Sequence, residues 1–212
     1  TWRELGVALY GSSDAVTGLN YSIAVVNGLD ASGFSNGTGI RGGRFEGGNA
    51  TASNIALTGS VQYVMQHFTF QISAYYGGSA GLTKREADSL QLNSGMFGTP
   101  VGLGEVNVQY RKDRLTAKVL FAAISIPEAD KINRAYANNT AKLSIGGYAE
   151  VAYRILKKLK TDAFICYENF DLNSSIPKNG IKNEILKQQY IIAGFSCFPT
   201  PGVVVKLDYV YK

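Results

Sequence analysis

Apolar and polar residues alternate one by one over much of this chain. The clearest case lies at residues 102–124, where two alternating runs flank the short stretch Lys112-Asp113-Arg114. In the first run Val106 and Val108 alternate with Glu105, Asn107 and Gln109. Successive side chains of a β-strand point to opposite faces, so this pattern predicts a hairpin with one apolar and one polar face.

The same alternation recurs along the chain and predicts ten strands. They are expected at 3–11, 19–28, 55–64, 68–77, 102–111, 115–125, 141–156, 161–171, 188–198 and 203–212. Helical periodicity is weak throughout, and we expect a turn of helix only around 84–92, within a loop. The pattern therefore predicts an all-β chain that forms a single domain over residues 1–212.

The connections between the predicted strands alternate strictly between short and long. The short ones are 12–18, 65–67, 112–114, 157–160 and 199–202, and the long ones are 29–54, 78–101, 126–140 and 172–187. Short periplasmic turns, long external loops and strands of ~9–11 residues are typical of an antiparallel outer-membrane β-barrel. A soluble β-sandwich with its apolar face packed inside shows the same alternation within strands and is the rival interpretation.

Aromatic residues on the apolar face fall at two levels. Tyr63, Phe68 and Tyr110 are close to short turns, and Tyr76 and Tyr167 lie toward long loops. Girdles of this kind mark the two membrane–water interfaces of a barrel. The alternative is that tyrosine and phenylalanine are simply common in strands.

The polar face carries charges that suit a water-filled lumen better than a packed core. Its candidate pore-lining residues are Glu105, Arg111, Lys118, Lys142, Glu150, Arg154 and Lys206, and the first two long loops add Arg41, Arg44, Lys84 and Arg85. Each single charge is explained as well by balance with a neighbouring opposite charge. As a set, the cations favour a mild preference for anions, because a low-dielectric channel focuses their field.

Composition narrows the classes of function. The net charge is +5 over 212 residues, but no basic helix or Lys/Arg-rich run suggests nucleic acid binding. No window approaches the ~18 consecutive apolar residues of a transmembrane helix. No signal peptide is recognisable and both ends stop within strand patterns. We expect either that a signal has been removed along with more of the chain, or that this is an internal piece of a longer protein.

Residues for catalysis or metal binding are sparse. The single histidine, His67, lies in a three-residue turn, so we expect neither an enzyme nor a metal or cofactor site. Cys166 and Cys197 fall on opposite faces by parity, which argues against a disulfide. The glycines between 37 and 48 do not join a strand to a helix and predict a flexible loop.

Several longer segments resemble the phosphate-selective porin (porin O and P) family of Gram-negative outer membranes. They are GIRGGRFEGG (39–48), LGEVNVQYRKDRLTAKVLFAAISIPEADKINRAYANNT (103–140), GGYAEVAYRIL (146–156), YENFDLNSSIPKNG (167–180) and LKQQYIIAGFSCFPTPGVVVKLDY (186–209). The resemblance implies a barrel of about sixteen strands, commonly trimeric, with a long loop folded into the pore. Ten strands would then be part of such a barrel.

The resemblance implies a channel in the outer membrane for passive diffusion of small solutes, anions or phosphate among them. Its partners would be the lipid bilayer, two further copies in a homotrimer and the solutes. Two alternatives stay open: a barrel that acts as an adhesin or receptor through its long loops, and a soluble β-sandwich binding module. The sequence leaves open which long loop folds inward, with 29–54 and 78–101 as candidates by length.

Overall fold

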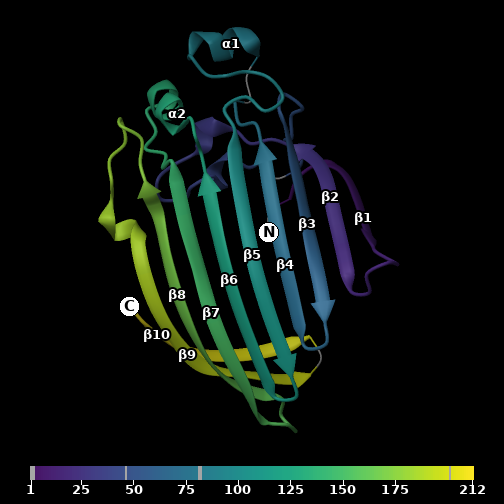
Figure 1. The fold of residues 1–212 in the computed structure, drawn as a ribbon. Helices are drawn as coiled ribbons and strands as arrows, with labels where there is room; N and C mark the ends of the chain where they lie inside the picture. The colour runs from purple at the N-terminus through teal and green to yellow at the C-terminus, as the bar shows by residue number, and fades with distance from the viewer. Residues whose placement is uncertain (1–2, 46, 81–82, 201) are drawn as a thin grey trace.

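Ten antiparallel strands form one sheet in chain order, which confirms the all-β prediction (Figure 1). The computed structural model describes residues 3–45, 47–80, 83–200 and 202–212. Within these ranges the sheet is open, with the first and last strands at its edges. The strands are β1 (Gly6–Ser12), β2 (Leu19–Asn27), β3 (Ile55–Met65), β4 (Phe68–Gly77), β5 (Val101–Lys112), β6 (Leu115–Ser125), β7 (Leu143–Leu156), β8 (Thr161–Ser175), β9 (Lys187–Thr200) and β10 (Val203–Tyr211).

Strand ends differ from the prediction at three places that bear on function. β1 begins at Gly6 and not at residue 3. β7 begins at Leu143, so Lys142 precedes the strand. β8 continues to Ser175, which places Tyr167 near the middle of that strand. The predicted position of Tyr167 toward a long loop was therefore wrong.

Two short α-helices lie in the described parts of the long loops. Helix α1 (Lys84–Ser89) confirms the expected helical turn and starts with a capping box between Thr83 and Glu86. Helix α2 (Ala129–Tyr136) was not predicted. Its eight residues are too few for a clear helical period, and its buried Ile132 shows that packing stabilises it. In the described part of the chain, no helix has the length and apolar composition to cross a membrane.

The strand register confirms the two faces. Val108 lies opposite Phe70 on β4 and Val119 on β6, whereas Asn107 lies opposite Gln71 and Leu120. The apolar face is uncovered even at the centre of the sheet. Its exposed fractions are 61% for Ile72, 54% for Val119 and 55% for Ile165. A sandwich would bury this face against a second sheet, but the described residues form one sheet.

The buried apolar core lies at the loop end of the polar face. Leu29 and Phe34 of the β2–β3 loop and Ile132 of α2 are at most 1% exposed. They belong to one cluster that packs on Tyr75 and Leu103, two residues of the polar face. The long loops therefore bury their apolar side chains against the inside of the curved sheet.

The sheet curls toward its polar face. β9 and β10 pass behind the lower ends of the central strands in Figure 1. A hollow of about 450 Å³ is lined by residues from the β5–β6 turn and from β10, two segments that are not neighbours in the sheet. The polar face is thus the concave one, and the apolar face is convex.

Candidate functional site

The hollow at the turn end of the polar face gathers five of the predicted pore-lining residues. These are Arg111, Lys118, Glu150, Arg154 and Lys206. We call it the turn-end hollow. Its remaining lining residues are Asp113, Arg114, Thr116, Ala152, Asp162, Phe164, Ser196 and Phe198. Five cations and three carboxylates therefore line it.

Two cation–carboxylate pairs run across neighbouring strands in the turn-end hollow. Lys118 Nζ on β6 lies 3.1 Å from Glu150 Oε1 on β7. Arg154 donates two hydrogen bonds to Asp162, with Nε–Oδ1 at 2.6 Å and Nη2–Oδ2 at 3.0 Å. Paired side chains in register on adjacent strands stabilise the sheet, and bidentate geometry holds the guanidinium in place. These four charges are therefore largely neutralised.

The remaining cations of the hollow are less well balanced. Neither Arg111 nor Arg114 forms an ion pair with any residue in the described ranges. Lys206 Nζ lies 4.4 Å from the centroid of the Phe164 ring and 4.0 Å from Asp208 Oδ2. The hollow thus presents net positive charge beside the short β5–β6 turn.

Polar side chains, all but Glu105 uncharged, cover the middle of the polar face on β2 to β5. They bond to one another across and along the strands, as in a wall that faces water. The bonds are Ser22 Oγ–Ser60 Oγ at 2.9 Å, Gln62 Nε2–Gln71 Oε1 at 3.1 Å, Gln71 Nε2–Ser73 Oγ at 3.1 Å and Asn107 Nδ2–Glu105 Oε1 at 2.8 Å. Glu105 therefore belongs to this middle zone, away from the turn-end hollow.

The long loops together cover the loop end of the polar face. We call the described residues of 28–54, 78–100, 126–142 and 176–186 the loop cap. Its first segment is joined to the second by backbone bonds: the Leu29 N–H donates to Gly78 O at 3.0 Å and the Ala31 N–H to Ser79 O at 2.7 Å. Both candidate loops contribute to the buried cluster: 29–54 supplies Phe34, and 78–101 supplies Ala87 and Leu92.

Asparagine side chains connect this first loop to the far side of the loop cap. Asn138 Nδ2 donates to Ala31 O at 3.2 Å, and Asn36 Nδ2 donates to Ile181 O at 3.3 Å. Ile181 in turn exchanges two bonds with Asn139, at 2.8 and 2.9 Å. The β2–β3 loop therefore reaches across the mouth of the curved sheet to the β8–β9 loop.

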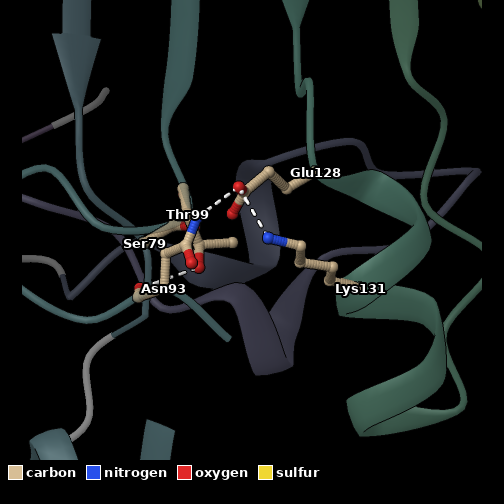
Figure 2. Close-up of polar contacts among 5 residues, drawn as sticks. All are labelled: Ser79, Asn93, Thr99, Glu128 and Lys131. Atoms are coloured by element: carbon tan, nitrogen blue, oxygen red, sulfur yellow. Dashed lines mark hydrogen bonds and ion pairs between the residues drawn. The ribbon is translucent and has the colours of Figure 1, made fainter. Parts of the chain in front are cut away.

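The second long loop is joined to α2 by the polar contacts in Figure 2. Ser79 Oγ donates to Thr99 O at 2.6 Å, and Thr99 Oγ1 donates to Asn93 O at 3.0 Å. Glu128 then accepts from Asn93 Nδ2 and, at 2.9 Å, from Lys131 Nζ. The loop cap is thus one connected layer.

The predicted loop cations are not brought into the turn-end hollow. Arg41 is exposed and Arg44 is half-buried in the first loop. Burial lowers the pKa of Arg44, and the nearby charge of Arg41 lowers it further, although Glu4 opposes the shift. Lys84 and Arg85 are exposed on α1, at the outer tip of the loops.

Glu86 and Lys142 also lie at the loop end of the sheet. Glu86 accepts bonds from the Thr83 side chain and backbone, which lower the pKa of this exposed carboxyl. Lys142 is exposed at a bend before β7, and its backbone N–H donates to Ser175 O at 2.8 Å. Lys142 therefore lies at the opposite end of the sheet from the turn-end hollow.

Sequence reasoning missed Arg114 and Asp113 as parts of the site, because both belong to the predicted turn. A signal was present: Arg114 shares its parity with Thr116 and Lys118, so an extension of β6 by one step places it on the polar face. That it shares the hollow with Lys206 depends on the curl of the sheet, which no local pattern reveals.

Gly43 provides a test of the loop cap. A Cβ at this position would lie 2.3 Å from Asp30 O and 2.4 Å from Cε1 of Phe34. We expect Gly43→Ala to cost about 1–3 kcal/mol of cap stability through overpacking, measured by hydrogen exchange of residues 29–45. Gly37 has nothing within 4 Å of its Cβ position, so Gly37→Ala is the matched control. Equal protection in both variants would contradict this packing.

Cys166 and Cys197 are free and lie on opposite faces, as predicted. Cys166 lies opposite Glu150 in the register of the polar face, and Cys197 lies opposite Val205 on the apolar face. Over the described ranges, no three His, Cys, Asp or Glu side chains are grouped in a way that could hold a metal ion.

Comparison with known proteins identifies no family. No family model matches the chain. It is similar to an uncharacterized protein of Aquifex aeolicus (strain VF5), with 26% identity over 226 residues. The match covers 99% of this chain and 49% of that protein, so the chain spans about half the length of the relative it matches.

Proposed function

We propose that this chain forms part of the wall of an outer-membrane β-barrel channel for small solutes. The observation that carries the proposal is the pair of contrasting faces on one curled sheet. The convex face is apolar and exposed at its centre, with Ile72 at 61% and Val119 at 54%. The concave face carries the charged turn-end hollow. This is the orientation in which lipid surrounds a barrel and water fills its lumen.

The exposed apolar side chains of the convex face would be covered by lipid. Exposed large apolar side chains occur on each of the ten strands, and an extended apolar surface of this kind marks a site of contact with lipid or with another protein. Lipid tails would cover it, and the polar backbone groups are already paired along the sheet. In the proposal, further strands outside this chain pair with β1 and β10 and close the barrel, and three copies associate in the Gram-negative outer membrane. No cofactor, nucleic acid or chemical step is involved.

In the proposed channel, the charges of the concave face favour the passage of anions slightly over that of cations. Solutes would enter past the loop cap, which narrows the mouth, and leave through the turn-end hollow. The guanidinium groups of Arg111 and Arg114 have no ion-pair partner among the described residues, so their field is available to a passing anion. The paired charges of Lys118 and Arg154 contribute less to this field.

Conductance in planar bilayers tests the proposal. We expect discrete channels whose reversal potential in a salt gradient shows a mild preference for anions. The double substitution Arg111→Glu, Arg114→Glu replaces the two least balanced cations, so it should reverse this preference while channels persist. The matched control Lys84→Glu, Arg85→Glu makes the same change of charge on α1 and should have a smaller effect. Absence of channels from the intact protein would refute the function.

A further inference from the structure

Two short turns on adjacent strands carry four lysines that do not line the turn-end hollow. They are Lys112 at the end of β5 and Lys157, Lys158 and Lys160 in the β7–β8 turn. All four are exposed, and none forms an ion pair with a residue in the part of the chain that the structure describes. The strands that carry these turns are adjacent, since β6 pairs with β7.

Lys112 lies on the apolar face and not in the turn-end hollow. It continues the parity of Val108 and Tyr110, and it lies opposite Leu115 in the register. Leu115 in turn lies opposite Tyr153 on β7. From mid-strand to turn, the side chains of this face therefore change from aliphatic to aromatic to cationic.

The β7–β8 turn combines cations with an exposed apolar side chain. Leu159, between Lys158 and Lys160, is 58% exposed, and Ile155 just before the turn is 42% exposed. Lysines beside exposed aliphatic and aromatic side chains suit the level of lipid headgroups, where the apolar parts enter the acyl region and the ammonium groups reach phosphate.

The lysines are confined to one sector of the turn end. The predicted short connections 12–18, 65–67 and 199–202 contain neither lysine nor arginine. Even within the β5–β6 turn the cations divide between the faces, because Arg111 and Arg114 line the hollow and Lys112 lies on the apolar face. A uniform requirement for positive charge at the membrane surface would not produce this distribution.

We propose that Lys112, Lys157, Lys158 and Lys160 bind the phosphate groups of anionic phospholipids in the leaflet that surrounds the short turns. We call these four residues the lysine rim. The inference rests on the proposed function, since it requires the apolar face to lie in a bilayer. Electrostatic attraction to a phosphate at the end of an apolar surface selects a lipid over a free anion, because the tails of the lipid gain contact with Tyr153 and Leu159.

Lipid selectivity around the protein tests the lysine rim. The protein is reconstituted in phosphatidylcholine vesicles with spin-labelled phosphatidylglycerol or phosphatidylcholine, and the motionally restricted fraction gives their relative association. We expect phosphatidylglycerol to be preferred on the order of fivefold. The substitution of all four rim lysines by glutamine should bring the ratio close to one. The control variant Lys84→Gln, Arg85→Gln, Lys178→Gln, Lys182→Gln also removes four cations, from the loop end, and should keep the preference.

Two results of this experiment would contradict the lysine rim. An equal loss of preference in the control variant would show general attraction to a cationic protein and no lysine rim. Loss of preference on addition of inorganic phosphate, but not of sodium chloride at equal ionic strength, would show a site for free phosphate. Conductance of the same samples separates the two proposals: channels without lipid preference refute only the lysine rim, whereas absence of channels refutes the proposed function.

Discussion

The substitution Val108→Arg is expected to lower the free energy of unfolding by about 2–4 kcal/mol for the protein folded in phospholipid vesicles. Val108 lies opposite Phe70 and Val119, so the guanidinium would enter the centre of the apolar face. In a bilayer this cation loses its hydration, and no acidic partner lies next to it in the register. Reversible urea unfolding in vesicles, followed by the circular dichroism of the β-sheet, measures the change.

The neighbouring substitution Asn107→Arg is the matched control, because it adds the same side chain one residue away on the polar face. We expect little change in its unfolding free energy and an altered conductance, since Asn107 lies opposite Gln71 and Leu120 on the concave side. Equal destabilisation at both positions would contradict the assignment of the faces to lipid and lumen.

The substitution Phe34→Ala should cost about 3–5 kcal/mol within the loop cap. Phe34 is 1% exposed and belongs to the cluster that joins Leu29 and Ile132 to the polar face. Removal of the ring leaves a cavity at the centre of this cluster. Because the strand ladder does not depend on Phe34, the cap should open locally before the sheet unfolds.

Two measurements report this opening. Hydrogen exchange should lose protection in residues 29–45 and 129–140, and conductance should rise as the mouth of the channel widens. The control Phe34→Leu keeps most of the apolar volume and should have a much smaller effect on both. Unchanged conductance in Phe34→Ala, with protection lost as expected, would show that the loop cap does not narrow the solute path.

The strands were predictable from sequence because their signal is local. The alternation of Asn107 and Val108 reports the two faces directly, and a one-residue error would exchange every side chain between them. Short turns and long loops likewise appear as interruptions of the pattern. Helix α2 was missed because eight residues that depend on packing leave little periodic signal.

The loop cap was beyond the reach of a local pattern. The hydrogen bond from Asn36 to Ile181 joins residues 145 positions apart. The local sequence of neither segment predicts this contact. The sequence left two loops as candidates for the inward position, and in the structure both enter one buried cluster, through Phe34 of the first and Leu92 of the second. Contacts of this kind depend on where distant segments meet in space.

The sequence by itself determined the ten strands, their order of short and long connections and the faces on which Glu105, Lys118 and Arg154 lie. These follow from the two-residue period of a strand, which each segment carries independently. The tertiary structure alone decided which charges share the turn-end hollow. Arg114 and Lys206 line the same hollow because the sheet curls toward its polar face, and that curvature arises from the twist accumulated over many strands.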